Sequence, residues 1–259
     1  MRPLAELPAQ GVRGIFFDID ETLTTEGRLT AQAYAAMERL KNAGLLVVPI
    51  TGRPAGWCDH IARMWPVDAV VGENGAFYFW HGEGRLGRRY VDDAATRAAR
   101  RSRLAGIGER ILAVVPGCAL ASDQAYREAD LAIDFCEDVP ALPLAAAERI
   151  ATLMRESGLT AKISSIHVNG WFGGSDKLST TRLLARERFG IELDAAQREF
   201  VFAGDSPNDA PMFGFFELSV GVANVMRFAG RLGCDPGFVT LAHSGAGFAE
   251  LADHLLSRR

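Results

Sequence analysis

The chain has 259 residues, of which 48% are hydrophobic and 23% charged, with a net charge of −4 and a pI of about 5.8. This balance is ordinary for a globular chain and gives no overall basic field, so we expect neither a nucleic-acid nor a membrane partner. No apolar run approaches the ~20 residues of a membrane helix, and the first residues lack the apolar segment of a signal peptide. The four cysteines are scattered without metal-binding spacing, which predicts reduced thiols and a cytoplasmic protein.

The first third of the chain alternates between strand and helix patterns. A buried strand is expected from residue 14 up to the aspartates at 18 and 20, and Thr30 and Gly44 are expected to bound a helix over 31–43. The next expected elements are a strand (45–50), a helix (55–64), a short strand (69–71) and an aromatic strand (76–80). This alternation predicts a parallel sheet, and right-handed crossovers bring the strand ends to a common edge.

The middle of the chain changes in composition at Gly82, Gly84 and Gly87. It predicts an arginine-rich helix over 93–113, a second helix over 143–157, and short strands at 117–121, 131–135 and 161–169. We interpret residues 84–171 as an α+β unit inserted into the larger fold, with Gly170 to Ser175 as the return hinge. The core would then be discontinuous and comprise residues 1–83 and 172–259.

The parallel pattern resumes after the insert. A helix is expected over 176–189, capped by Ser175 or Asp176 and ended by Gly190. Further expected elements are strands at 200–203, 218–222 and 238–241, the last at the sheet edge, and helices at 225–232 and 248–255. The predicted fold class is therefore α/β, with a Rossmann-like parallel-sheet core and an inserted α+β domain.

Asp18 and Asp20 are the first candidates for chemistry. Strand alternation places both carboxylates on one side, where their repulsion requires a shared proton, a hydrogen-bond network or a cation. Taken alone, the pair fits an ordinary acidic turn equally well. Three further polar clusters follow a buried strand or begin a helix: Thr51-Gly52, Lys177, and Asp205 with Asn208 and Asp209. Oxygen-only ligands suit Mg²⁺, and hydroxyl, amide and ammonium donors suit a phosphate.

In this order the clusters resemble the four motifs of the haloacid dehalogenase superfamily. Asp18-Ile19-Asp20-Glu21-Thr22 is similar to the first motif, Thr51-Gly52-Arg53 to the second, Lys177 to the third, and Gly204 through Asp209 to the fourth. The insert resembles the large α+β cap (type C2B) of subfamily IIB, the Cof-like group. Glu73-Asn74-Gly75-Ala76 and Gly221-Val222-Ala223-Asn224 are similar to stretches of that group. The core resemblance covers residues 12–82 and 172–255, whereas the cap is similar in pattern only.

The resemblance implies a role for each motif residue. Asp18 would be the nucleophile that forms an aspartyl-phosphate, and Asp20 the general acid and later the base. The Mg²⁺ ligands would be Asp18, the backbone carbonyl of Asp20, and Asp205. Thr51, the Gly52 amide, Lys177 and Asn208 would bind the phosphoryl oxygens. Asp209 would orient Lys177 or a metal-bound water.

Other residues are candidates for contact with the leaving group. They are Arg53, Asn74, Arg127 with Glu128, and the pair His167 and Asn169, which share one strand face. Each also fits a plainer reading: an exposed loop arginine, a turn asparagine, or a solvent-exposed strand face.

The resemblance implies a Mg²⁺-dependent phosphatase that acts on a small phosphorylated metabolite, a sugar phosphate or a phosphorylated glycoside. A sugar phosphomutase and a non-catalytic binding module on the same fold remain alternatives. The sequence leaves open whether the protein is a monomer or a dimer.

Overall fold

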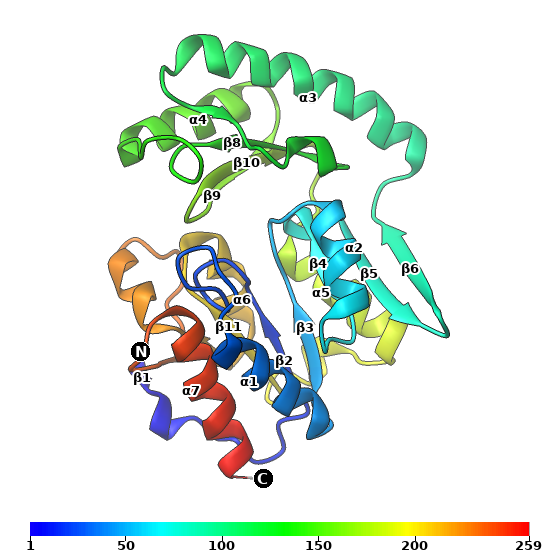
Figure 1. Ribbon diagram of the computed structural model, residues 1–259, viewed down its shortest axis with the longest axis vertical. Helices are drawn as coiled ribbons and strands as arrows, with labels where there is room; N and C mark the ends of the chain where they lie inside the picture. Colours follow the sequence, from blue (N-terminus) through cyan, green and yellow to red (C-terminus); the bar gives the residue numbers. More distant parts are fainter. Residues whose placement is uncertain (259) are drawn as a thin grey trace.

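The computed structural model describes residues 1–258, and its central sheet has six parallel strands in the order β1-β13-β12-β11-β2-β3 (Figure 1). Their bounds are β1 Arg2–Pro3, β13 Phe238–Val239, β12 Leu218–Gly221, β11 Phe200–Gly204, β2 Gly14–Phe17 and β3 Leu46–Pro49. β2 and β11 are neighbours in this sheet, with Phe16 paired to Phe202. The apolar sequence of these strands reflects burial on both faces.

Alternate side chains of β2 pack against helices on opposite faces of the sheet. Ile15 and Phe17 join the core cluster with α1 (Ala31–Asn42) and α7 (Ser244–Ser257). Phe16 joins the cluster on the other face, with α5 (Lys177–Phe189) and α6 (Ala210–Phe215). This three-layer packing fixes the direction of β2, and therefore the place where Asp18 emerges.

A second sheet lies beside β3 and is antiparallel. It comprises β4 (Val70–Gly72), β5 (Phe77–Gly82) and β6 (Arg85–Tyr90). A single parallel bridge between Ile50 and Val71 connects it to the end of β3. The helix α2 (Ala55–Met64) packs on this sheet through Cys58 and Ile61.

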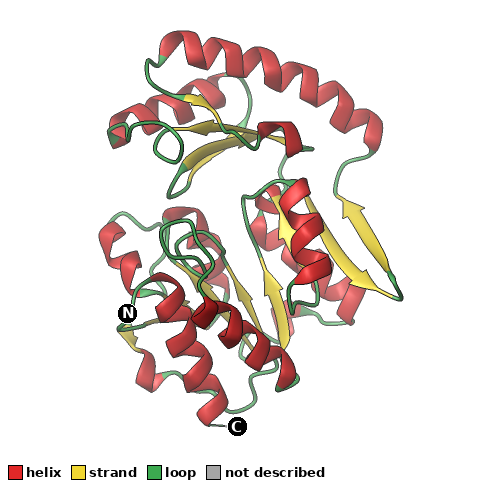
Figure 2. Cartoon of the chain, in the orientation of Figure 1, coloured by secondary structure: helices red, strands yellow, loops and turns green. Residues whose placement is uncertain are grey.

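The inserted domain is an antiparallel sheet covered by two helices on the side away from the core (Figure 2). The strand order is β7 (Ala119–Leu120), β8 (Asp130–Asp134), β10 (His167–Trp171) and β9 (Thr160–Ile163). The helices are α3 (Ala94–Val114) and α4 (Leu144–Glu156). Val168 packs with them in the core of this domain. Its neighbours His167 and Asn169 therefore belong to the face that looks toward the central sheet.

Short 3₁₀ helices complete the fold. They are Leu4–Glu6, Glu73–Gly75, Gln124–Tyr126, Leu193–Ala195, Pro207–Asp209 and Ala223–Phe228. Across residues 1–258, none of the helices combines the length and the apolar character that crossing a bilayer requires.

The α/β fold class is confirmed, with several corrections to individual elements. The expected strand 161–169 is a hairpin, because Ser164 accepts and donates hydrogen bonds that turn the chain back at His167. The expected helix over 225–232 is only the 3₁₀ turn Ala223–Phe228, and α6 and β1 were not expected. Because β1 pairs with β13, the strand at Phe238 is not at the edge.

The limits of the inserted domain stay a prediction, but β6 bears on them. This strand was not expected, and it pairs with β5 along its full length. Residues 85–90 therefore lie with the core strands, although the predicted boundary assigns them to the insert. The pairing favours a boundary after Tyr90.

Candidate active site

The four predicted clusters meet at the carboxyl edge of the central sheet. Asp18 directly follows β2, Thr51 follows β3, and Asp205 follows β11. Lys177 is the first residue of α5, whose start is fixed by a capping box between Asp176 and Ser179. Parallel strands end on a common edge, and this is the usual ligand position of such sheets.

Lys177 bridges two aspartates in the buried interior of this edge. Its Nζ donates to Asp18 Oδ1 at 2.7 Å and to Asp209 Oδ1 at 2.8 Å. The side chain of Lys177 is only 4% exposed, and those of Asp18 and Asp209 are 6% and 0% exposed. Although burial opposes the charge, the two carboxylates raise the pKa of Lys177 above its usual value. Lys177 is thus a fixed ammonium beside the candidate nucleophile, and Asp209 holds it there.

A glycine of the turn Glu73–Gly75 allows α5 to begin at this place. Gly75 has φ +107°, and a Cβ there would lie 2.1 Å from the Asp176 carbonyl oxygen. Its own carbonyl accepts a hydrogen bond from Thr180 Oγ1 at 2.5 Å. The close approach of this turn to the start of α5 requires glycine, and it positions Lys177.

Asp205 is held by neutral donors rather than by a cation. Thr22 Oγ1 lies 3.4 Å from its Oδ1, and Asn224 Nδ2 donates to its Oδ2 at 3.2 Å. The backbone N–H of Asp205 donates to Asp209 Oδ2 at 3.1 Å. Thr22 and Asn224 occur in the stretches that carry the family resemblance, but the sequence alone gave neither of them a role.

Asp18, Asp205 and Asp209 form a group that fits a divalent cation. One carboxylate oxygen of each lies within 4.8 Å of the others, and all three residues are buried. Three carboxylates and one ammonium leave two negative charges, so a divalent ion would balance the group. Burial, opposed by Lys177, raises the pKa of Asp18 to about 7. Burial also raises the pKa of Asp205 well above its usual range, and the neighbouring carboxylates of Asp18 and Asp209 add to the shift.

Asp20 lies outside this group and pairs with Arg53. Arg53 Nε and Nη2 donate to Asp20 Oδ1 at 2.9 and 2.8 Å. Arg53 is buried, with its guanidinium 4.4 Å from the Trp57 ring. It also reaches the inserted domain, where Nη2 donates to Glu137 Oε1 at 2.7 Å. The reading of Arg53 as an exposed loop arginine is therefore wrong.

The phosphate-binding candidates Thr51, Gly52 and Asn208 lie at the same edge of the sheet as Asp18. Thr51 is fully buried, and its Oγ1 accepts from the Arg53 N–H at 3.0 Å. Gly52 lines the same cavity as Asp18, and a Cβ there would lie 3.1 Å from Asn74 Nδ2. Asn208 follows β11 in a 3₁₀ turn, with its Oδ1 accepting from Ser206 Oγ at 2.7 Å.

Asn74 supports the turn after β3. It has φ +53°, as a turn asparagine does, and its N–H donates to the Thr51 carbonyl at 3.0 Å. Its Nδ2 is buried and has no hydrogen-bond partner among the described residues. Asn74 thus combines the turn role with a free donor beside Gly52.

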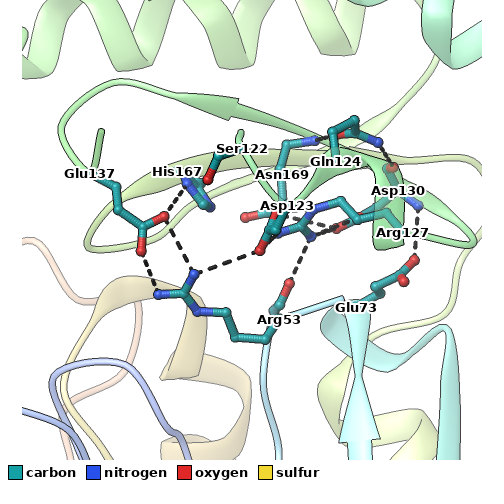
Figure 3. Close-up of polar contacts among 12 residues, drawn as sticks. Arg53, Glu73, Ser122, Asp123, Gln124, Arg127, Asp130, Glu137, His167 and Asn169 are labelled. Carbon is teal, nitrogen blue, oxygen red and sulfur yellow. Dashed lines mark hydrogen bonds and ion pairs between the residues drawn. The ribbon is translucent and has the colours of Figure 1, made fainter. Parts of the chain in front are cut away.

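Two links from the inserted domain reach the same region of the core. Arg127 Nη1 donates to the Gly52 carbonyl at 2.9 Å, and its other contacts are to Asp123 and Asp130 (Figure 3). Glu73 accepts backbone N–H groups of the inserted domain at Glu128, Ala129 and Asp130. Because the donors of Arg127 are directed at protein acceptors, the expectation that it contacts the leaving group is not supported. Glu128, similarly, pairs with Arg101 at 2.7 Å.

His167 and Asn169 are buried and face the core, so their reading as a solvent-exposed strand face is wrong. Both line a cavity with Asp18, Asp20 and Arg53, together with Ser164, Ser165 and Ile166 of the β9–β10 turn. His167 Nε2 lies 2.9 Å from Glu137 Oε2, and Asn169 Nδ2 donates to Asp130 Oδ2 at 2.9 Å. The sequence gave no indication of Ser164, Ser165 or Glu137, since no local pattern distinguishes them from surface residues.

Comparisons with known proteins agree with this fold. Residues 15–93 match the model of a family described as haloacid dehalogenase-like hydrolase. No protein of curated function matches the chain. Among solved structures, a HAD/Cof-like hydrolase from Plasmodium vivax is 17% identical with a TM-score of 0.70, covering 96% of this chain and 97% of that one. The resemblance to the haloacid dehalogenase superfamily is confirmed by the family match over residues 15–93 and by the shared fold.

Two further similar structures are those of phosphatases of phosphorylated sugars. A sucrose-phosphatase from Synechocystis, in complex with sucrose and phosphate, is 16% identical with a TM-score of 0.63, covering 94% and 98% of the two chains. The C-terminal domain of a Candida albicans (C. albicans) trehalose-6-phosphate phosphatase is 13% identical with a TM-score of 0.68, covering 95% and 93%. At these identities the likeness is one of fold.

Proposed function

We propose that this protein is a Mg²⁺-dependent phosphatase, which hydrolyses a small phosphorylated metabolite through an aspartyl-phosphate at Asp18. The observation that carries the proposal is the buried arrangement of Asp18, Lys177, Asp205 and Asp209 at the sheet edge. Such a group combines a nucleophilic carboxylate, a fixed ammonium and the ligands for a cation. An ordinary structural cluster would not bury three carboxylates with one ammonium.

Asp18 and Asp20 divide the chemistry between them. Asp18 attacks the phosphorus, so that a bond forms from its carboxylate oxygen and the bond to the leaving oxygen breaks. Asp20 gives a proton to that oxygen. In the second step Asp20 takes a proton from a water, the water attacks the phosphorus, and the bond to Asp18 breaks to release inorganic phosphate.

Three groups would stabilise the charge on the phosphoryl oxygens. Lys177 supplies a positive charge within hydrogen-bond distance of Asp18. Thr51 and Gly52 lie at the end of the neighbouring strand, and Asn208 lines the same cavity as Asp18. When bound, Mg²⁺ would supply further positive charge at these oxygens. The proposed ligands are Asp18, the backbone carbonyl of Asp20 and Asp205, and Asp209 would lie beside them.

The substrate class that we propose is a sugar phosphate or a phosphorylated glycoside. The cavity beyond Asp20 is lined by polar groups of Arg53, Ser164, Ser165, His167 and Asn169, which suit hydroxyl groups. The sucrose and trehalose-6-phosphate phosphatases of the same fold are consistent with this class. The cavity has a volume of about 20 Å³, room for one water, so substrate entry requires the inserted domain to move away from the core.

The two alternatives make different chemical predictions. A phosphomutase would convert a hexose 1-phosphate into the 6-phosphate without releasing phosphate. A binding module would bind phosphate or Mg²⁺ without turnover. The retention of Asp18, Asp20 and Lys177 argues against a binding module, and the phosphatase and the phosphomutase share these residues. We also propose a cytoplasmic location, because the four cysteines are free thiols.

The proposal is tested by release of inorganic phosphate from an aryl phosphate and from a panel of sugar phosphates. We expect turnover that requires Mg²⁺, is abolished by EDTA, and is lost in Asp18→Asn. A matched control is Asp253→Asn, because that side chain is 62% exposed and lies on α7. Full activity of Asp18→Asn would overturn the mechanism.

A further inference from the structure

Arg53 is a core residue that contacts both the core and the inserted domain. It follows Thr51-Gly52 in the core, where its Nε and Nη2 donate hydrogen bonds to the carboxylate of Asp20. Its outer edge faces the inserted domain, where Glu137 Oε1 accepts from Nη2 at 2.7 Å and Oε2 lies 3.4 Å from Nη1 (Figure 3). One guanidinium therefore connects the candidate general acid to the inserted domain.

Glu137 is itself held in place. It lies just after β8, where the carboxylate of Asp134 accepts the backbone N–H groups of Cys136, Glu137 and Asp138 at 2.8–2.9 Å. His167, on the neighbouring strand β10, lies 2.9 Å from Glu137 Oε2. Burial favours the neutral acid, but the close contacts of Glu137 with His167 and Arg53 outweigh it and lower the pKa of Glu137 to about 2. Glu137 is therefore a carboxylate at the pH of any ordinary assay.

The contact with Glu137 is more than a surface ion pair. Arg53 is 4% exposed and Glu137 is 25% exposed, so the pair is largely removed from water. Without Glu137, the guanidinium would keep Asp20 as its close partner, with Asp123 3.7 Å away. Its orientation, and with it the orientation of the Asp20 carboxylate, would then be less determined.

We propose that Glu137 is a positioning residue for Asp20, and that it acts through Arg53 to align the general acid when the inserted domain lies against the core. The proposal rests on the proposed phosphatase function, because it assigns Asp20 the proton transfer of that reaction. Glu137 itself does not touch the reacting atoms. Its effect is confined to steps in which Asp20 moves a proton.

The test uses leaving groups that differ in their need for a proton. Phenyl phosphate and p-nitrophenyl phosphate have similar shapes, but p-nitrophenolate departs without protonation whereas phenolate benefits from it. The value of kcat/KM reports on the step in which the leaving group departs, and not on the later hydrolysis of the aspartyl-phosphate. In Glu137→Gln we expect kcat/KM to fall by about tenfold or more for phenyl phosphate and by less than about twofold for p-nitrophenyl phosphate.

Two other variants complete the experiment. Glu137→Asp keeps the charge but shortens the side chain, so we expect an intermediate loss with phenyl phosphate; this variant also keeps the test decisive if Glu137→Gln does not fold. Glu156→Gln is the matched control, because Glu156 is an exposed glutamate of the same domain, 4.0 Å from Arg149. We expect Glu156→Gln to equal wild type with both esters.

The outcomes separate this inference from the proposed function. An equal loss with both esters, or no loss with either, would overturn the role of Glu137 while leaving the phosphatase proposal intact. If the wild-type protein hydrolysed neither ester in the presence of Mg²⁺, the proposed function itself would fail, and the inference with it. Asp20→Asn provides the reference, since we expect it to show the same dependence on the leaving group with a larger loss.

Discussion

Replacement of Glu73 by alanine is expected to weaken the attachment of the inserted domain. The Glu73 carboxylate is fully buried and accepts four backbone N–H groups. Three come from residues 128–130 of the inserted domain, at 2.6–3.2 Å, and one comes from Ala55 at the start of α2, at 3.0 Å. Glu73→Ala would leave all four donors without this acceptor.

The expected loss of stability follows from these four hydrogen bonds. An unsatisfied buried donor costs about 1–3 kcal/mol, and the variant also relieves the burial of a carboxylate, which offsets part of the loss. We therefore expect a decrease of about 3 kcal/mol in the free energy of unfolding. For a chain of this size, that corresponds to a decrease of about 6–12 °C in the midpoint of thermal unfolding.

Two measurements examine this prediction. Thermal unfolding gives the overall loss, and amide hydrogen exchange gives its location, with faster exchange expected at the N–H groups of Glu128, Ala129 and Asp130. The control is Glu156→Ala, an exposed change for which we expect an effect within about 0.5 kcal/mol. If Glu73→Ala were as stable as this control and exchange at residues 128–130 were unchanged, Glu73 would not anchor the domain.

Three further outcomes are expected. Lys177→Met leaves Asp18 and Asp209 without the ammonium group that pairs with them. In steady-state assays kcat should therefore fall by more than about 100-fold, and a loss below about tenfold would contradict the role of Lys177 in stabilising the phosphoryl oxygens. Mg²⁺ at about 100 times its Kd should stabilise wild type by about 2.7 kcal/mol in scanning calorimetry, whereas Asp205→Asn should gain little. Burial, reinforced by the Asp130 carboxylate, raises the pKa of Glu73 from its usual 4.5 to about 8. The carboxyl is protonated in both the folded and the unfolded chain below about 4.5, and the cost of its buried charge accrues between about 4.5 and about 8. Denaturant titrations should therefore show stability decreasing as the pH rises over this range and levelling above it, a trend that Glu73→Gln should reduce.

The sequence predicted the parts of the fold that depend on local pattern. The strand before Asp18 and the helix ended by Gly190 were confirmed, because a continuous apolar run and a left-handed glycine cap are local signals. The strand at Arg85–Tyr90 was missed, because its charged residues lie on an edge strand that is half exposed. The fold of the 161–169 segment was also missed, since the turn at Ser164 depends on side-chain hydrogen bonds that no periodicity indicates.

The residues of the candidate site, like the elements of the fold, could be identified from the sequence only in part. Asp18, Thr51, Lys177 and Asp205 were identified because each follows a strand or begins a helix, and topology brings such positions together.

The contacts between the inserted domain and the core could not be identified in that way. Arg53 and Glu137 are 84 residues apart in sequence, and only the docking of two domains places them 2.7 Å from each other. Arg127, which the sequence suggested as a substrate contact, donates to the Gly52 carbonyl because of the same docking of the two domains.

The most direct test of the account is to trap the phosphorylated enzyme. The protein is mixed with Mg²⁺ and an aryl phosphate, quenched in acid during turnover, and examined by intact-mass and peptide mass spectrometry. We predict that wild type gains the mass of one phosphoryl group on the peptide that contains Asp18, and that Asp18→Asn gains none. Turnover with no adduct on wild type, or an adduct on another residue that persists in Asp18→Asn, would contradict the assignment of Asp18 as the nucleophile.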